Sequence, residues 1–130
     1  AHMYRKVGDE FIADDFAHEQ SIVFETEKGL VIFNSCSHGG IANIVREVQN
    51  AFAGKKIYAV IGGFHMMKLS GMDTLAIPEE EVVETAQELK GLGVEEIYTG
   101  HCTGNIAFGI LKKELGEMVH ALGTGETVVF

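Results

Sequence analysis

The chain has 130 residues, enough for one domain with a buried core. Hydrophobic residues make up 46% of it and charged residues 22%, with a single proline, which excludes global disorder. The formal net charge of -9 argues against nucleic acid as a partner, and no apolar run approaches the roughly 20 residues that span a bilayer. We therefore expect a cytoplasmic protein without a membrane partner.

The first part of the chain predicts strands. Residues 1–3 have the pattern of a tag remnant, so the natural sequence is expected to start near residue 4. Residues 4–15 carry few apolar side chains and predict a weak strand or an extended arm. Segments 21–25 and 30–34 are rich in Ile, Val and Phe, and the short polar segment between them, which contains glycine, predicts a hairpin.

Strands and helices then alternate along the chain. In order, the patterns predict a helix over 40–53, a buried strand over 57–61, a helix that Pro78 begins and Gly91 ends, a short strand over 96–99, a helix over 105–115 and a closing strand over 127–130. An irregular loop over 66–77 interrupts this order. The order predicts an α/β fold with a mixed sheet.

Histidine occurs in a glycine- or serine-containing turn after three successive predicted strands. The turns are Ser35-Cys36-Ser37-His38-Gly39-Gly40, Gly62-Gly63-Phe64-His65 and Gly100-His101-Cys102-Thr103-Gly104. In a mostly parallel sheet these strand ends lie side by side, and His18, just before the hairpin, can reach the same edge. Histidine and cysteine are the usual ligands of zinc and related ions, so this edge is a candidate metal site.

Each of these residues also has a structural interpretation. His18 alone is compatible with a surface position, Cys36 with a small buried hydrophobe, His65 with a loop hydrogen bond and Cys102 with a core filler. His120 lies in a tail without such a turn, and we expect it to be structural. The joint placement of histidines at strand ends favours the metal site, because the separate structural roles do not explain it.

These motifs resemble the carboxyl-terminal half of a metallo-β-lactamase-superfamily protein. The residues that carry the resemblance are His18-Glu19-Gln20-Ser21, Ser35-Cys36-Ser37-His38, Gly63-Phe64-His65 and Gly100-His101-Cys102-Thr103-Gly104. The branch that they resemble is that of the dihydropterin-ribofuranosylaminobenzene-phosphate synthase-like hydrolases, over nearly all of the chain from Asp15 onward. The resemblance implies that residues 4–130 form half of an αββα sandwich, with one mixed sheet covered by helices on one face.

The resemblance also implies roles for single residues. His18 and His101 take the places of two metal-ligand histidines, and Cys36 falls where most members carry a bridging aspartate and some a cysteine ligand. His38 is implied as an extra ligand or substrate contact, and His65 as a substrate-facing catalytic acid or base. The implied cofactor is zinc, or else iron or manganese, with one or two ions in the complete domain. The implied chemistry is hydrolysis of an ester, amide or phosphoester by a metal-activated water.

The main ligand string of the family, His-x-His-x-Asp-His, does not occur in the 130 residues. We therefore expect an incomplete half that is inactive alone, either cut from a longer enzyme or encoded as a split subunit. The expected substrate is a small molecule, phosphorylated compounds included. One face of the sheet would lack a cover, which is unusual for a monomer, so we expect a second copy, a separate amino-terminal half or exchanged elements to cover it.

Two other interpretations stay open. In the first, the chain is a non-catalytic half-domain that forms a homodimer and holds at most one metal ion or anion, or none, at its strand ends. In the second, it is a redox or metal-sensing module that uses Cys36 and Cys102. The second requires the two residues to lie within disulfide reach, about 7 Å between Cα atoms.

Overall fold

The computed structural model describes residues 3–130, and its strands and helices alternate after an initial hairpin. In chain order the elements are β1 (Tyr4–Val7), β2 (Glu10–Ala13), β3 (Ser21–Thr26), β4 (Gly29–Cys36), α1 (Ile41–Ala51), β5 (Ile57–Gly63), α2 (Glu79–Gly91), β6 (Glu96–Thr99), α3 (Asn105–Leu115) and β7 (Val119–Ala121). Short 3-10 turns precede and follow α3, at His101–Thr103 and Gly116–Met118. Within residues 3–130, no helix combines the length and apolar character needed to cross a membrane.

Strands β3 to β7 form one mixed sheet in that order. β3 runs antiparallel to β4, and the pairs from β4 to β7 are parallel. The register aligns one apolar row across all of these strands, formed by Val23, Ile32, Val60, Ile97 and Val119. This row belongs to the main hydrophobic core, so it marks the face of the sheet that is buried.

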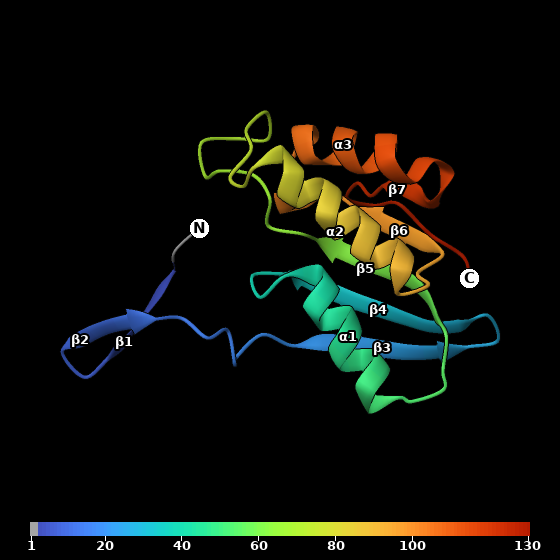
Figure 1. The fold of residues 1–130 in the computed structure, drawn as a ribbon, viewed down its shortest axis with the longest axis horizontal. Coiled ribbons are helices and arrows are strands. Elements are labelled where there is room, and N and C mark those ends of the chain that lie inside the picture. The colour runs from blue at the N-terminus through green and yellow to red at the C-terminus, as the bar shows by residue number, and fades with distance from the viewer. Residues whose placement is uncertain (1–2) are drawn as a thin grey trace.

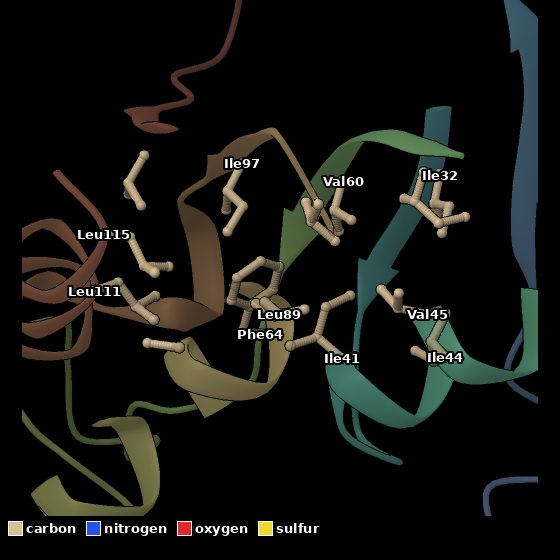
Figure 2. Packing of buried hydrophobic residues seen from close by; sticks show 14 of the residues in the cluster. Ile32, Ile41, Ile44, Val45, Val60, Phe64, Leu89, Ile97, Leu111 and Leu115 are labelled. Atoms are coloured by element: carbon tan, nitrogen blue, oxygen red, sulfur yellow. The ribbon is translucent and has the colours of Figure 1, made fainter. Parts of the chain in front are cut away.

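The helices α1, α2 and α3 cover that face (Figure 1). Each helix turns apolar side chains, spaced three or four residues apart, toward the strands. These side chains are Ile41, Ile44, Val45 and Val48 of α1, Val82, Ala86 and Leu89 of α2, and Ala107, Leu111 and Leu115 of α3. Figure 2 shows several of them facing Ile32, Val60 and Ile97 of the sheet. Burying one such Ile or Leu side chain contributes about 1.5–3 kcal/mol to folding.

The opposite face of the sheet is only partly covered. Its central residues Val31, Ala59 and Ile61 are buried beneath Tyr58, Tyr98, Leu122 and Phe130. On the β3 and β4 side, however, Ile22, Phe24 and Phe33 are 61%, 53% and 38% exposed. No helix in the described part of the chain lies over them. The expectation of a mixed sheet with helices on one face is thus confirmed.

The structure corrects two expectations near the chain ends. Residues 4–13 form the antiparallel hairpin of β1 and β2, which extends away from the main sheet, where a single strand or arm was expected over residues 4–15 (Figure 1). The last strand is β7, and residues 127–130 form no strand, although their β-branched side chains favour one. β7 already occupies the edge of β6, with Tyr98 opposite His120, while Phe130 packs on the aromatic side chains of the open face.

Candidate metal centre

The carboxyl ends of β4, β5 and β6 meet at one edge of the sheet. Cys36 at the end of β4 is in register with Gly63 at the end of β5, and Gly62 is in register with Thr99 at the end of β6. The turns that follow these strands therefore lie side by side. This is the arrangement that parallel pairing predicts for the three histidine-containing turns.

Two cysteines from different turns are in contact at this edge. The Sγ atoms of Cys36 and Cys102 lie 2.8 Å apart, and both thiols are free. Cys102 is 5% exposed, and its Sγ accepts a hydrogen bond from the backbone N–H of His65 at 3.2 Å. Gly63 makes room for this sulfur, because a Cβ atom at that position would lie 2.6 Å from it. The site therefore presents two adjacent sulfur donors on rigid backbone.

Within residues 3–130, histidines extend this pair into two groups whose ligand atoms lie within 4.8 Å of one another. The first group is Cys36, His101 and Cys102, and the second is Cys36, His38 and His65. Cys36 is common to both groups, and its Sγ lies 3.5 Å from Nδ1 of His65. The ring of His65 in turn meets the ring of His38 edge to face, with centroids 4.4 Å apart.

A buried chain of hydroxyl groups holds the turns together. The Thr99 hydroxyl donates to the carbonyl of Gly62 at 2.8 Å, so the hydroxyl of Thr103, 2.6 Å away, must donate to Thr99. The oxygen of Thr103 then accepts from the backbone N–H of Phe64 at 2.9 Å. Both threonines are fully buried, so this satisfied chain fixes the turn after β6 against the turn after β5.

The backbone of both turns is strained where a histidine occurs. His65 has φ 52° and His101 has φ 50°, in the left-handed region that non-glycine residues seldom adopt. The strain is balanced by hydrogen bonds, since the carbonyl of Cys102 accepts from the N–H groups of Met66 and Met67 at 2.9 and 3.1 Å. Strained residues held by their surroundings are concentrated at functional sites.

The environment shifts the pKa of two of these side chains. Burial, followed by the hydrogen bond and charge of Cys102 and the charge of Glu19, raises the pKa of Cys36 to about 12. Burial, followed by the charge of His38, lowers the pKa of His65. In the metal-free protein Cys36 is therefore a neutral thiol and His65 a neutral imidazole near pH 7. A metal ion that binds Cys36 must displace its proton.

Glu19 belongs to the motif His18-Glu19-Gln20-Ser21, but no role in the site was expected for it. Its Oε1 accepts from the backbone N–H of His38 at 2.7 Å, and its Oε2 accepts from the N–H of Gly39 at 3.1 Å. The predicted hairpin did contain a signal for it. Because Ser21 pairs with Asn34, a residue two positions before Ser21 lies near the turn that follows β4.

Two more histidines lie outside these groups: His18, which was expected to be a ligand, and His120, which was expected to be structural. The side chain of His18 is 70% exposed, and its Nδ1 lies 3.9 Å from the carboxylate of Asp14. Among the described residues it belongs to neither group of potential ligands. His120 lies on β7, where its Nε2 is 2.6 Å from the carboxylate of Glu96 and its ring stacks on Tyr98.

A cavity of about 660 Å³ opens beside His38 and His65. Its walls come from the turn before α1, from the loop before α2 and from the side of α2 that carries Glu80, Glu81, Glu84 and Glu88. Ser37 also lines it, and the buried hydroxyl of this residue has no hydrogen-bond partner within residues 3–130. The volume is in the range of small-molecule binding sites.

Comparisons with known proteins support the resemblance. No family model matches the chain. The 7,8-dihydropterin-6-methyl-4-(beta-D-ribofuranosyl)-aminobenzene-5'-phosphate synthase of Methanocaldococcus jannaschii is 35% identical over 128 residues, which cover 98% of this chain and 41% of that protein. The crystal structure of Tm1679, a metal-dependent hydrolase of the beta-lactamase superfamily, matches with a TM-score of 0.84 and 31% identity, over 98% of this chain and 46% of that one. The chain thus spans less than half the length of either protein.

In sequence and in fold the chain is similar to less than half of a metal-dependent hydrolase of the beta-lactamase superfamily, and this is the class of protein that it resembles. Within that superfamily, the predicted resemblance to the dihydropterin-ribofuranosylaminobenzene-phosphate synthase branch is confirmed by the relative from Methanocaldococcus jannaschii.

Proposed function

We propose that the chain supplies part of the metal centre of a hydrolase in which a metal-activated water attacks an ester or phosphoester. The observation that carries the proposal is the convergence of Cys36, His101 and Cys102 at the carboxyl edge of the sheet. Two sulfur donors and an imidazole suit zinc better than the harder magnesium or calcium ions. The similarity to a metal-dependent hydrolase supports a metal cofactor.

The residues present fit such an ion. Cys36, His101 and Cys102 would hold it, and His38 would join through the second group that shares Cys36. His18, the remaining ligand that the motifs imply, would have to turn inward from solvent to join either group. A bound zinc ion would supply Lewis-acid activation of water and of the substrate oxygen. Because both thiols are free, the proposal suits a reducing compartment such as the cytoplasm.

His65 is the proposed acid–base residue. It lines the cavity next to His38, and its lowered pKa leaves its imidazole neutral and able to accept a proton near pH 7. The name of the relative from Methanocaldococcus jannaschii supports a small phosphorylated compound as substrate.

We further propose that turnover requires more than these 130 residues. They contain no His-x-His-x-Asp-His string, and the chain matches less than half of its relatives. An amino-terminal half would supply the remaining ligands and cover Ile22, Phe24 and Phe33. The same exposed side chains favour a second candidate, a non-catalytic homodimer in which another copy covers this face and at most one ion binds.

Elemental analysis of a size-exclusion peak, with its mass measured by light scattering, tests the metal centre. The protein is purified under reducing conditions, incubated with zinc and freed of excess metal. We expect near-stoichiometric zinc in the wild type. Cys36→Ser and Cys102→Ser should lose it, and His120→Ala should keep it. Protein that retains no zinc, iron or manganese would contradict the proposed centre.

A further inference from the structure

Neighbouring residues His18 and Glu19 have opposite environments. The side chain of His18 is 70% exposed, whereas that of Glu19 is 14% exposed. Glu19 reaches from the segment before β3 to the turn between β4 and α1, 19 residues farther along the chain. In this segment, the side chain that enters the site is therefore the carboxylate of Glu19, while the imidazole of His18 faces solvent.

The carboxylate of Glu19 makes three contacts with this turn. Two are the hydrogen bonds from the backbone N–H groups of His38 and Gly39, at 2.7 and 3.1 Å. In the third, its Oε1 lies 3.2 Å from Nδ1 of the His38 ring. Since a carboxylate only accepts hydrogen bonds, its charge favours the tautomer of His38 that carries the proton on Nδ1.

The ring of His38 is held from two further sides. Phe16 stacks against it, with centroids 5.7 Å apart and planes 17° apart. His65 meets it edge to face at 4.4 Å. Because Nδ1 is the ring nitrogen that lies beside the carboxylate of Glu19, we expect Nε2 to be the nitrogen that binds a metal ion or a substrate. Carboxylate partners of this kind orient metal-binding histidines.

We propose that Glu19 is a positioning residue of this centre, which acts through His38 by fixing its backbone turn and keeping its proton on Nδ1. The inference rests on the proposed function for its ligand, the zinc ion. Of the neighbours His18 and Glu19, the proposal thus makes Glu19 the residue that orients the site. The two oxygens of its carboxylate accept from two backbone N–H groups. Glutamine at this position would keep the volume but offer only one acceptor oxygen for those two donors.

Two measurements test the proposal. The first is zinc affinity, from competition with a chromophoric chelator under reducing conditions, for the wild type, Glu19→Gln, His38→Ala, the double variant and His18→Ala. Removing a carboxylate partner costs about 10- to 100-fold in metal affinity. We expect this loss in Glu19→Gln, no further loss when Glu19→Gln is added to His38→Ala, and no loss in His18→Ala. A purely structural role would lower affinity equally with and without His38.

The second measurement is the tautomer of His38 in the metal-free protein, from two-bond ¹H–¹⁵N correlation spectra. We expect the proton on Nδ1 in the wild type and a mixture of tautomers in Glu19→Gln. His120 is an internal reference for which we expect the opposite tautomer, because its Nε2 lies 2.6 Å from the carboxylate of Glu96.

An affinity that falls in His18→Ala but not in Glu19→Gln would overturn the proposal, as would an Nε2–H tautomer for His38 in the wild type. The tautomer is measured without metal. If the wild type binds no zinc, the proposed function fails, while the position of the proton still decides whether Glu19 orients His38.

Discussion

The sulfur atoms of Cys36 and Cys102 lie 2.8 Å apart although 66 positions separate the residues in the chain. One belongs to the end of β4 and the other to the 3-10 turn after β6, so the fold and not the local sequence brings them together. A disulfide bond is about 2.05 Å long, so only a small shift separates this contact from a covalent bond. The same two sulfurs are needed for the proposed metal centre, which makes metal binding and disulfide formation mutually exclusive.

We therefore predict that a disulfide oxidant links Cys36 to Cys102 in the metal-free protein. With oxidised glutathione, two thiols become one disulfide, and the glutathione disulfide accepts the two electrons and two protons to leave two reduced glutathione molecules. Intact mass spectrometry should show the loss of two hydrogen atoms, and peptide mapping should identify the link. Stoichiometric zinc added first should prevent it. Oxidised protein that binds zinc as tightly as reduced protein would contradict the shared role of the sulfurs.

The meeting of Cys36, His38, His65 and His101 at one edge could be predicted because it follows from parallel strand order alone. Which side chain of a turn points inward could not. In the turn after β6, the left-handed backbone at His101 leaves this residue exposed and buries Cys102, and no sequence pattern indicates this choice.

The reactivity of Cys36 gives a second prediction. Because burial and the neighbouring Cys102 raise its pKa to about 12, little thiolate is present at neutral pH in the metal-free fold. Iodoacetamide should therefore modify Cys36 more slowly in the folded than in the urea-unfolded protein, and the folded-state rate should rise with pH above the usual thiol range. Peptide mass spectrometry of the wild type follows this site alone, because Cys36 and Cys102 lie in different tryptic peptides. Equal rates in folded and unfolded protein would contradict the predicted direction.

The glycine opposite the sulfur pair gives a third prediction. In Gly63→Ala the new Cβ would lie 2.6 Å from Sγ of Cys102 and 3.0 Å from the carbonyl oxygen of Ser35. The turn must shift to relieve this overlap, so we expect a loss of about 1–3 kcal/mol in unfolding free energy and weaker zinc binding. The matched control is Gly109→Ala in α3, where the added Cβ has no neighbour within 4 Å. Urea unfolding should show the control stabilised by about 0.5–1 kcal/mol.

The ends of the chain show a second limit of the sequence patterns. Residues 127–130 have the composition of a strand, but the edge of β6 is taken by the less obvious Val119–Ala121. The deciding factor is the length of the connection after α3, since β7 follows directly on the 3-10 turn that ends this helix. Strand propensity alone does not contain this information.

The exposed face of β3 and β4 supports the last prediction. Phe24 is 53% exposed and contacts Phe33 edge to face, with centroids 5.6 Å apart, on a face that no helix of residues 3–130 covers. If another copy covers this face, Phe24→Lys should convert a dimer to a monomer without lowering stability by more than about 1 kcal/mol, because the side chain is largely exposed within one chain.

Phe52→Lys is the matched control, since Phe52 is 41% exposed at the end of α1, away from this face. Light scattering across a concentration series measures both variants. The interface lies on the open sheet face if the wild type and Phe52→Lys are dimers and Phe24→Lys is a monomer. A dimer that survives Phe24→Lys would assign the contact to another surface, such as the projecting hairpin of β1 and β2. A monomeric wild type would instead direct the search to a separate polypeptide that covers the same aromatic pair.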